Sequence, residues 1–174
     1  PRHSAELVTQ GLLGTPVKVM KKQGGWSLIQ TPDEYIAWAN AGNITSMDAT
    51  TFQSWKNADK LIYLPTYGFS LDSVGNKVSD LVAGNVLAVE GESTENWTVR
   101  YPDDRIGLLK KEEAKRIKEW SKEIEMTDES LISAAVDLMG VPYLWGGTST
   151  KGVDCSGFTK TVYLRHALIL PRDA

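Results

Sequence analysis

Three adjacent residues near the end of the sequence, Asp154, Cys155 and Ser156, have side chains that could attack or bind a substrate. Cys155 is the only cysteine, so it can form neither a disulfide within the chain nor a zinc site built from several thiolates. It is therefore either a small buried apolar residue or a reactive thiol. A reactive thiol would perform nucleophilic attack on a carbonyl carbon.

The sequence around Cys155 predicts that the thiol lies at the start of a helix. A glycine-rich stretch over 140–147 precedes it, and an apolar run with helical spacing follows from Phe158. The helix dipole, worth about 0.3 to 1 kcal/mol, lowers a thiol pKa of about 8.5 by less than one unit, and only about 3% of a free thiol is ionised at pH 7. Asp154 opposes ionisation, although it could also act simply as the N-cap. A nucleophile here would need a histidine partner.

The sequence contains two histidines, His3 and His166. If the helix continues to His166, the eleven residues after Cys155 bring it back to almost the same face. It would then lie about 16.5 Å further along the axis, out of reach of the sulfur. His3 lies close to a chain end, where order is low. We expect neither histidine to act as the base.

Two motifs in this region resemble the signature of the NlpC-like cysteine peptidases, bacterial endopeptidases that cut peptidoglycan stem peptides. They are Pro142-Tyr-x-Trp-Gly-Gly and Gly152-x-Asp-Cys-Ser-Gly-Phe. The resemblance implies a circularly permuted papain-like α+β domain and no metal or other cofactor. Its catalytic His lies well downstream of the Cys, followed by a third polar residue. The sequence ends at Ala174 before either, so we expect the first part of a catalytic domain, truncated before its base.

The same resemblance implies roles for four side chains. Cys155 is the nucleophile, and Tyr143 forms a hydrogen bond near the thiol. Asp154 and Ser156 help to bind the free amino end of an L-Ala-γ-D-Glu substrate. A core-packing role for Tyr143 is the alternative.

A unit of sequence recurs after about 70 residues. Each copy has a glycine before an apolar strand, a tryptophan in a second strand, and an acidic turn before a third strand. The matching segments begin at Gly14, Trp26 and Pro32 in the first copy and at Gly84, Trp97 and Pro102 in the second. Short strands joined by tight turns predict two small barrels, and both copies resemble the bacterial SH3-like domain found in cell-wall enzymes.

SH3-like domains ahead of an NlpC-like segment resemble the subgroup that hydrolyses the bond from γ-D-glutamate to a diamino acid. In that subgroup an SH3-like domain closes the cleft and donates an acidic residue and a tyrosine to the substrate's amino group. The best matching positions are Glu6 and Tyr35, and an ordinary surface role is the alternative for each. A peptide with an acylated N-terminus would leave such carboxylates unpaired, so the pocket would select trimmed peptides.

The fold class is therefore predicted as multidomain: two small all-β SH3-like barrels, followed by the N-terminal part of an α+β papain-like domain. Asp48 is expected to cap a short helix between the barrels, and charged residues at helical spacing predict a surface helix after Leu109. The predicted segments are a first SH3-like domain 1–48, a linker 49–59, a second SH3-like domain 60–109, a linker helix 110–126 and the peptidase portion 127–174.

Composition restricts the possible partners. Hydrophobic residues make up 41% and charged residues 24%, as expected of a chain that folds into a globular form. The net charge is -3 and no basic cluster stands apart from acidic neighbours, so we expect no nucleic acid partner. The apolar stretches are far shorter than the roughly 20 residues of a membrane span. The expected partner is a stem peptide. A second chain that supplies the rest of the catalytic domain is one explanation for the truncation, and a truncated gene or proteolysis are the alternatives.

The predicted function is therefore a cysteine endopeptidase that cuts the bond from γ-D-glutamate to diaminopimelate or lysine in stem peptides with a free N-terminal L-Ala. Without its base, the chain alone is expected to be weakly active or inactive. The alternative is a non-catalytic protein that binds wall peptides or acts as a scaffold. The first residue, Pro1, fits removal of a leader and a periplasmic, secreted or envelope location, with peptide recycling in the cytoplasm as the alternative.

Overall fold

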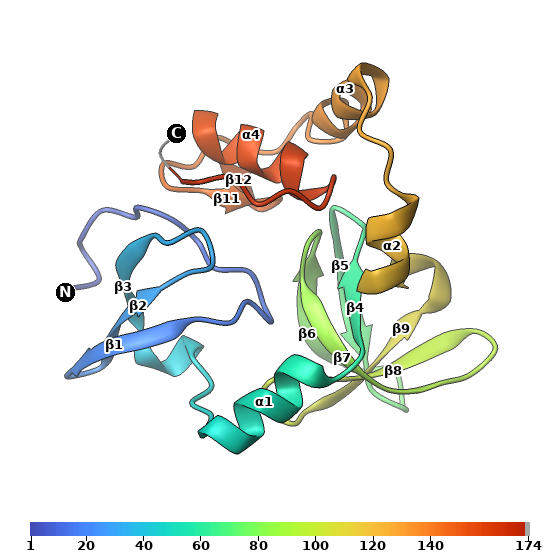
Figure 1. Ribbon diagram of the computed structural model, residues 1–174, viewed down its shortest axis with the longest axis horizontal. Coiled ribbons are helices and arrows are strands. Elements are labelled where there is room, and N and C mark those ends of the chain that lie inside the picture. Colours follow the sequence, from blue (N-terminus) through green and yellow to red (C-terminus); the bar gives the residue numbers. More distant parts are fainter. Residues whose placement is uncertain (173–174) are drawn as a thin grey trace. The chain divides into compact units, whose positions relative to one another are not determined.

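The computed structural model describes residues 1–172 of the 174-residue chain, so the last two residues of the predicted segment 127–174 lie outside the described part. The chain divides into two compact units. The first combines Pro1–Ile44 with the residues from Glu125 onward, and the second is Thr45–Ile124. Figure 1 labels most of the elements and colours the chain from its N-terminus to its C-terminus.

The beginning of the first unit is a three-stranded antiparallel sheet with strand order β1-β2-β3. Its strands are β1 (Lys18–Gln23), β2 (Trp26–Gln30) and β3 (Ile36–Asn40), followed by the short 3-10 helix η1 (Ala41–Asn43). Gly24, whose φ is +57°, and Gly25 form the two-residue turn between β1 and β2, where glycine permits the left-handed backbone that tight hairpins need.

The second unit contains a seven-stranded sheet with strand order β10-β4-β7-β8-β9-β5-β6. The strands are β4 (Lys60–Tyr63), β5 (Tyr67–Leu71), β6 (Lys77–Val82), β7 (Val86–Glu92), β8 (Asn96–Arg100), β9 (Ile106–Lys110) and β10 (Ala114–Arg116). Its core holds the largest fully buried side chains of the described residues, Tyr63, Tyr101, Leu61, Leu81, Leu87 and Leu109.

The two acidic turns of the predicted repeat have the same backbone geometry. Glu34 and Asp104 are both left-handed, with φ values of 64° and 65°. The Glu34 N–H donates to the Thr31 carbonyl at 2.9 Å, and the Asp104 N–H donates to the Tyr101 carbonyl at 3.1 Å. Gly14 and Gly84, which open the two copies, also share a positive φ, of 82° and 88°. The repeat predicted from the sequence is confirmed at these turns.

The tryptophans of the two copies are not equivalent, in contrast to the prediction. Trp26 pairs with Asn40 at the end of β3, whereas Trp97 pairs with Leu109, one residue before the end of β9. A shift of one residue turns a strand side chain to the opposite face. Trp97 is accordingly 8% exposed and donates from its indole N–H to the Ala114 carbonyl at 3.2 Å.

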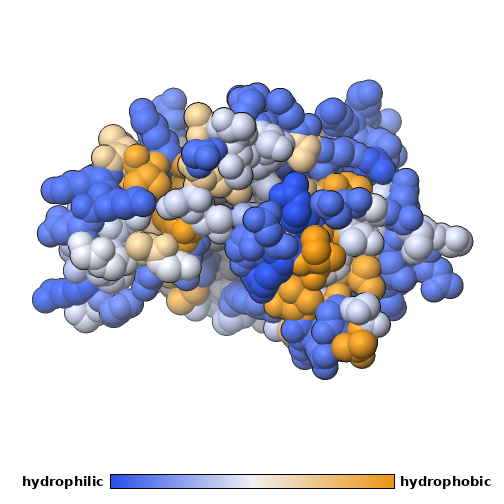
Figure 2. Space-filling model, turned by 90° about the horizontal axis from the view of Figure 1, so that it is seen from below, coloured by the Kyte–Doolittle hydropathy of each residue, from blue (hydrophilic) through white to orange (hydrophobic). Residues whose placement is uncertain are grey.

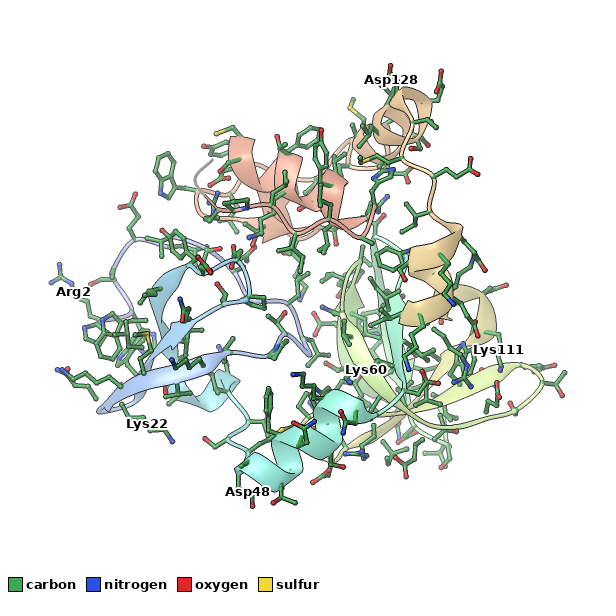
Figure 3. All side chains as sticks on the ribbon, viewed as in Figure 1. Arg2, Lys22, Asp48, Lys60, Lys111 and Asp128 are labelled. Carbon is green, nitrogen blue, oxygen red and sulfur yellow. The ribbon has the colours of Figure 1, made fainter. Side chains whose placement is uncertain are left out.

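The predicted capping role of Asp48 is confirmed. Helix α1 (Ala49–Asn57) starts where the Asp48 side chain accepts a hydrogen bond from the Thr51 N–H at 2.7 Å. Figure 3 labels Asp48 at this end of the helix. Trp55 is the buried residue of α1, whereas Phe52 on the same helix is partly exposed.

The predicted linker helix over 110–126 is wrong in its first part. The segment forms a 3-10 turn η2 (Lys111–Glu113), strand β10 (Ala114–Arg116) and then helix α2 (Ile117–Glu123). β10 pairs with β4, and Ala114 is buried there. The charged side chains have helical spacing, but burial of Ala114 at the sheet edge outweighs that weak local preference.

The first unit ends in two helices and a short hairpin. Helix α3 (Asp128–Val136) is capped by Thr127, and its start is labelled at Asp128 in Figure 3. Strands β11 (Thr148–Ser149) and β12 (Gly152–Val153) form the hairpin, and helix α4 (Cys155–Leu164) contacts both strands and α3 (Figure 1). Ala134 and Leu138, from α3 and the turn after it, pack with Val162 of α4 as a small apolar core.

On the face shown in Figure 2, hydrophilic residues predominate and hydrophobic residues gather in separate patches. Among residues 1–172, no helix is long and apolar enough to cross a membrane.

Candidate active site

Cys155 is the first residue of α4, and its side chain is exposed to solvent. The helix starts here because the Asp154 carboxylate caps it, accepting a hydrogen bond from the Gly157 N–H at 2.8 Å. The prediction of a thiol in the first turn of a helix is confirmed. The thiol is thus accessible to a substrate and lies at the positive end of the helix dipole.

Four donors surround the Asp154 carboxylate, which is only 7% exposed. Oδ1 accepts from the Gly157 N–H and from the Ser156 hydroxyl at 3.3 Å. Oδ2 accepts from the Gly146 N–H at 3.0 Å and from the Arg172 guanidinium in an ion pair. Because an ionised carboxylate offers about four acceptor positions, these four donors fill its capacity.

Arg172 is the least expected member of the site. Its side chain is buried, and three of its nitrogens donate to three residues in two segments of the chain. Nη2 pairs with Asp154, Nη1 donates to the Ser156 hydroxyl, and Nε donates to the Val8 carbonyl at 3.1 Å. The planar fork of a guanidinium suits such a junction.

The surroundings of Asp154 set its ionisation. Burial alone would raise its pKa, but the hydrogen bond from Arg172, the backbone N–H groups of Gly157 and Gly146, and the charge of Arg172 together lower it to about 2. Asp154 is therefore an anion at neutral pH, beside a cation that balances it.

Two glycines allow the backbones of this region to approach closely. A Cβ on Gly157 would lie 1.9 Å from the Gly147 carbonyl oxygen. Gly146 has a φ of +75°, and a Cβ there would lie 2.2 Å from the Leu7 carbonyl oxygen. These contacts explain why a glycine follows the Asp-Cys-Ser triplet and why a glycine follows the tryptophan of the Tyr-x-Trp-Gly-Gly motif.

Gln10 links the N-terminal segment to strand β11 by hydrogen bonds. Its side-chain oxygen accepts from the Thr148 N–H at 2.9 Å and from the Ser149 hydroxyl at 3.1 Å. Its carbonyl accepts from the Thr148 hydroxyl at 3.0 Å. With the Val8 contact to Arg172, these bonds make residues 8–10 part of the support of the nucleophile segment.

The turn between β2 and β3 is fixed to α4 by an ion pair between Asp33 and Lys160. Burial would raise the pKa of Asp33, but hydrogen bonds from Lys160 and Thr31 hold it below its ordinary value. Beside this pair lies a cavity of about 90 Å³, lined by residues that include Gln10, Thr148 and Leu164. Cys155 is not among the lining residues.

The remaining predicted site residues differ in their exposure to solvent. Tyr143 is 68% exposed, and its backbone pairs with Val153, two residues before Cys155. Tyr35 is half-buried and follows Asp33 in the turn attached to α4, and its carbonyl accepts from the Thr31 N–H at 3.0 Å. Glu6 is exposed in the segment just before Leu7.

Both histidine rings make contacts other than with Cys155. The His166 ring nitrogens lie 2.9 Å from the Val162 carbonyl and 3.0 Å from the Ser130 hydroxyl, joining α4 to α3. The His3 ring lies against Trp26 with a centroid separation of 4.9 Å. Among residues 1–172, no group of three or more His, Cys, Asp or Glu side chains could hold a metal ion.

Comparison with known families matches the two ends of the first unit. Residues 1–43 match the family described as the bacterial dipeptidyl-peptidase Sh3 domain, and residues 140–174 match the NlpC/P60 family. These matches support the predicted resemblance to NlpC/P60 proteins that carry an SH3 domain. The predicted fold class, SH3-like sheets followed by part of an NlpC/P60 papain-like domain, is confirmed.

Similar proteins extend the match across the chain. Dipeptidyl-peptidase 6 of Lysinibacillus sphaericus is 29% identical over all of this chain and 67% of its own length. Gamma-D-glutamyl-L-lysine dipeptidyl-peptidase of Bacillus cereus is 29% identical over 97% of this chain and 53% of its own length. A crystal structure of an NlpC/P60 family protein from Bacillus cereus has a TM-score of 0.79 at 26% identity, over 95% of this chain and 57% of that one. The chain therefore spans about half to two thirds of these proteins.

Sequence reasoning missed three polar residues of this region, Arg172, Lys160 and Asp33. Lys160 has a detectable signal, because it lies on the helix that starts at Cys155. Asp33 belongs to the acidic turn that was recognised only as part of the repeat. Arg172 follows the end of the predicted helix without any motif spacing to Asp154, and only the fold brings the two together.

Proposed function

We propose that the whole protein is a cysteine endopeptidase that hydrolyses the bond between γ-D-glutamate and an L-diamino acid, lysine or diaminopimelate, in peptidoglycan stem peptides with a free N-terminal L-Ala. The observation that carries this proposal is the exposed thiol of Cys155, placed at the start of a capped helix within an NlpC/P60 segment. The name of the Bacillus cereus relative, gamma-D-glutamyl-L-lysine dipeptidyl-peptidase, supports the choice of bond.

In the proposed reaction, the Cys155 thiolate attacks the γ-carbonyl carbon of D-glutamate. A backbone amide at the start of α4 stabilises the oxyanion. The amine of the diamino acid leaves with a proton, and water then hydrolyses the thioester to release L-Ala-D-Glu and the free thiol. The general base is assigned to the part of the whole protein that residues 1–172 do not span, because both histidines contact other groups.

Recognition of the free amino end is assigned to Glu6 and Tyr35. Their segments are both attached to the nucleophile region, since Gly146 closely approaches Leu7 and Lys160 pairs with Asp33. Asp154 has its acceptor positions filled by Gly157, Ser156, Gly146 and Arg172, so its part in the proposed recognition is to place Ser156 and the helix start.

The test is hydrolysis of L-Ala-γ-D-Glu-L-Lys by the whole protein, compared with the same peptide acetylated at its N-terminus. We expect release of lysine from the free peptide and roughly 100-fold slower release from the acetylated one, because acetylation removes the ammonium group that Glu6 and Tyr35 are proposed to bind. Equal rates for the two peptides would refute the proposed selectivity, and no release from either would refute the proposed activity.

The contacts of both histidine rings with other groups favour one alternative function for the 174 residues alone: binding of wall peptides without turnover. Binding of the free peptide, unchanged by Cys155→Ala and without lysine release from the whole protein, would support this alternative. For location we propose the cell envelope, which is where a peptidoglycan substrate is found.

A further inference from the structure

We infer that Arg172 is the positioning residue of the nucleophile, where it balances the charge of Asp154 beside Cys155 and fixes Ser156 on the other side. The inference rests on the proposed role of Cys155 as nucleophile. Its basis is geometric: one buried guanidinium contacts both sequence neighbours of the only cysteine.

The ion pair is enclosed by protein on both sides. The side chain of Arg172 is 3% exposed and that of Asp154 is 9% exposed. At such burial an unpaired charge is costly, and its field reaches neighbouring groups with little screening by solvent. An anion next to a thiol opposes formation of the thiolate. Pairing Asp154 with Arg172 therefore lets the carboxylate cap α4 without suppressing ionisation of Cys155.

The third contact of Arg172 ties this function to the SH3 segment. Nε donates to the Val8 carbonyl, which lies within the residues that match the SH3 family. Arg172 thereby joins the N-terminal segment, the capping carboxylate and the residue after the nucleophile in one junction.

Other charged groups on the elements that contact α4 have partners or lie elsewhere. Asp33 pairs with Lys160, and Asp137 pairs with Arg165 near the end of the helix. The remaining titratable groups on these elements or on the segment beside Arg172 include Tyr163 near the end of α4, His166 just after it, Lys151 in the β11–β12 turn, Tyr143 before that hairpin, Glu34 and Tyr35 beside Asp33, Asp128 and Glu129 at the start of α3, and Glu6.

The inference predicts shifts of opposite sign. Arg172→Met leaves Asp154 unbalanced, so the pH midpoint for Cys155 ionisation rises by about half to one unit. Asp154→Asn keeps a side-chain acceptor at the cap but leaves Arg172 unbalanced, so the midpoint falls. Combining the two substitutions removes both charges and returns the midpoint close to that of the wild type. Arg172→Lys retains the positive charge but loses the planar guanidinium. Its midpoint should therefore lie between those of the wild type and Arg172→Met.

The experiment is the rate of alkylation of the single cysteine by iodoacetamide as a function of pH, with folding checked by circular dichroism. Below the midpoint the rate follows the thiolate fraction, so Arg172→Met should react about 3- to 10-fold more slowly at pH 7. Arg165→Met, which removes an arginine from the far end of α4, is the matched control and should leave the profile unchanged. If Arg172→Met does not fold, the alkylation profile of the double variant is compared with that of Asp154→Asn instead.

Shifts of the same sign in Arg172→Met and Asp154→Asn, or no shift in either, would overturn the inference and leave Arg172 with a purely structural role. Because alkylation needs no turnover, opposite shifts in a protein that hydrolyses no peptide would support the inference and refute the proposed function. Peptide hydrolysis without a shift of the Cys155 midpoint in either variant would refute the inference and support the proposed function.

Discussion

Lys160 and Asp33 form an ion pair that joins the nucleophile helix α4 to the turn between β2 and β3. The side chains are 16% and 6% exposed, so this is a largely buried contact. It connects a residue five positions after Cys155 with the turn that carries Tyr35. The SH3 sheet is in this way attached directly to the helix that bears the proposed nucleophile.

Breaking this pair should destabilise the first unit. We predict that Lys160→Met lowers the free energy of unfolding by of the order of 3 kcal/mol, because it leaves Asp33 buried without its cation. The change is measured by urea denaturation. In the Asp33→Asn, Lys160→Met double variant the loss should be smaller than the sum of the single losses.

The matched control is Arg165→Met, which removes the more exposed ion pair with Asp137. We expect a loss of no more than about 1 kcal/mol there, as is typical of surface pairs. A loss at Lys160 no larger than the loss at Arg165 would contradict the structural role assigned to the pair.

Acid should weaken the protein through Asp154. Its folded pKa, about 2, lies below the ordinary value of 3.8, so its contribution to stability is complete above the ordinary value and disappears as the pH falls through about 2. We predict that the free energy of unfolding falls from pH 5 to pH 2, and that this fall is smaller in Asp154→Asn. Urea denaturation at several pH values measures the free energy of unfolding of the wild type and of Asp154→Asn. The same dependence on pH in both proteins would show that Asp154 is not held ionised by the fold.

The glycine after the nucleophile triplet should tolerate no side chain. In Gly157→Ala the new Cβ meets a backbone carbonyl oxygen at 1.9 Å, and neither backbone can move without breaking the start of α4. We predict that the free energy of unfolding falls by more than about 2 kcal/mol. We also predict that substrate no longer protects the Cys155 thiol from alkylation. Gly25→Ala is the control, since no atom lies within 4 Å of its added Cβ. Equal effects of the two substitutions would contradict the close approach.

A similar contact lies in the second unit. A Cβ on Gly68 would lie 2.0 Å from the hydroxyl oxygen of the buried Tyr63. We predict that Gly68→Ala destabilises the protein by about 1 to 3 kcal/mol and that adding Tyr63→Phe restores part of the loss, because it removes the clashing oxygen. Thermal unfolding of the two single variants and the double variant tests this, and strictly additive losses would rule out the clash as the cause.

The sequence predicted what depends on nearby residues. The cap at Asp154, the helix that starts at Cys155 and the two acidic turns all depend on short segments, and all are present. What it missed depends on distant contacts: Arg172 reaches Asp154 only through the path of the chain after α4, and β10 forms because Ala114 is buried against β4. The charges around Ala114 fit a helix equally well, so local spacing could not distinguish the two outcomes.

The central claim, that Cys155 is the nucleophile, is tested most directly by the mass of the whole protein after rapid acid quenching of its reaction with L-Ala-γ-D-Glu-L-Lys. The account predicts an L-Ala-γ-D-Glu adduct on the peptide containing Cys155, and a loss of at least about 1,000-fold in lysine release for Cys155→Ala. Lysine release by Cys155→Ala at the wild-type rate, without any adduct on the wild-type thiol, would contradict it.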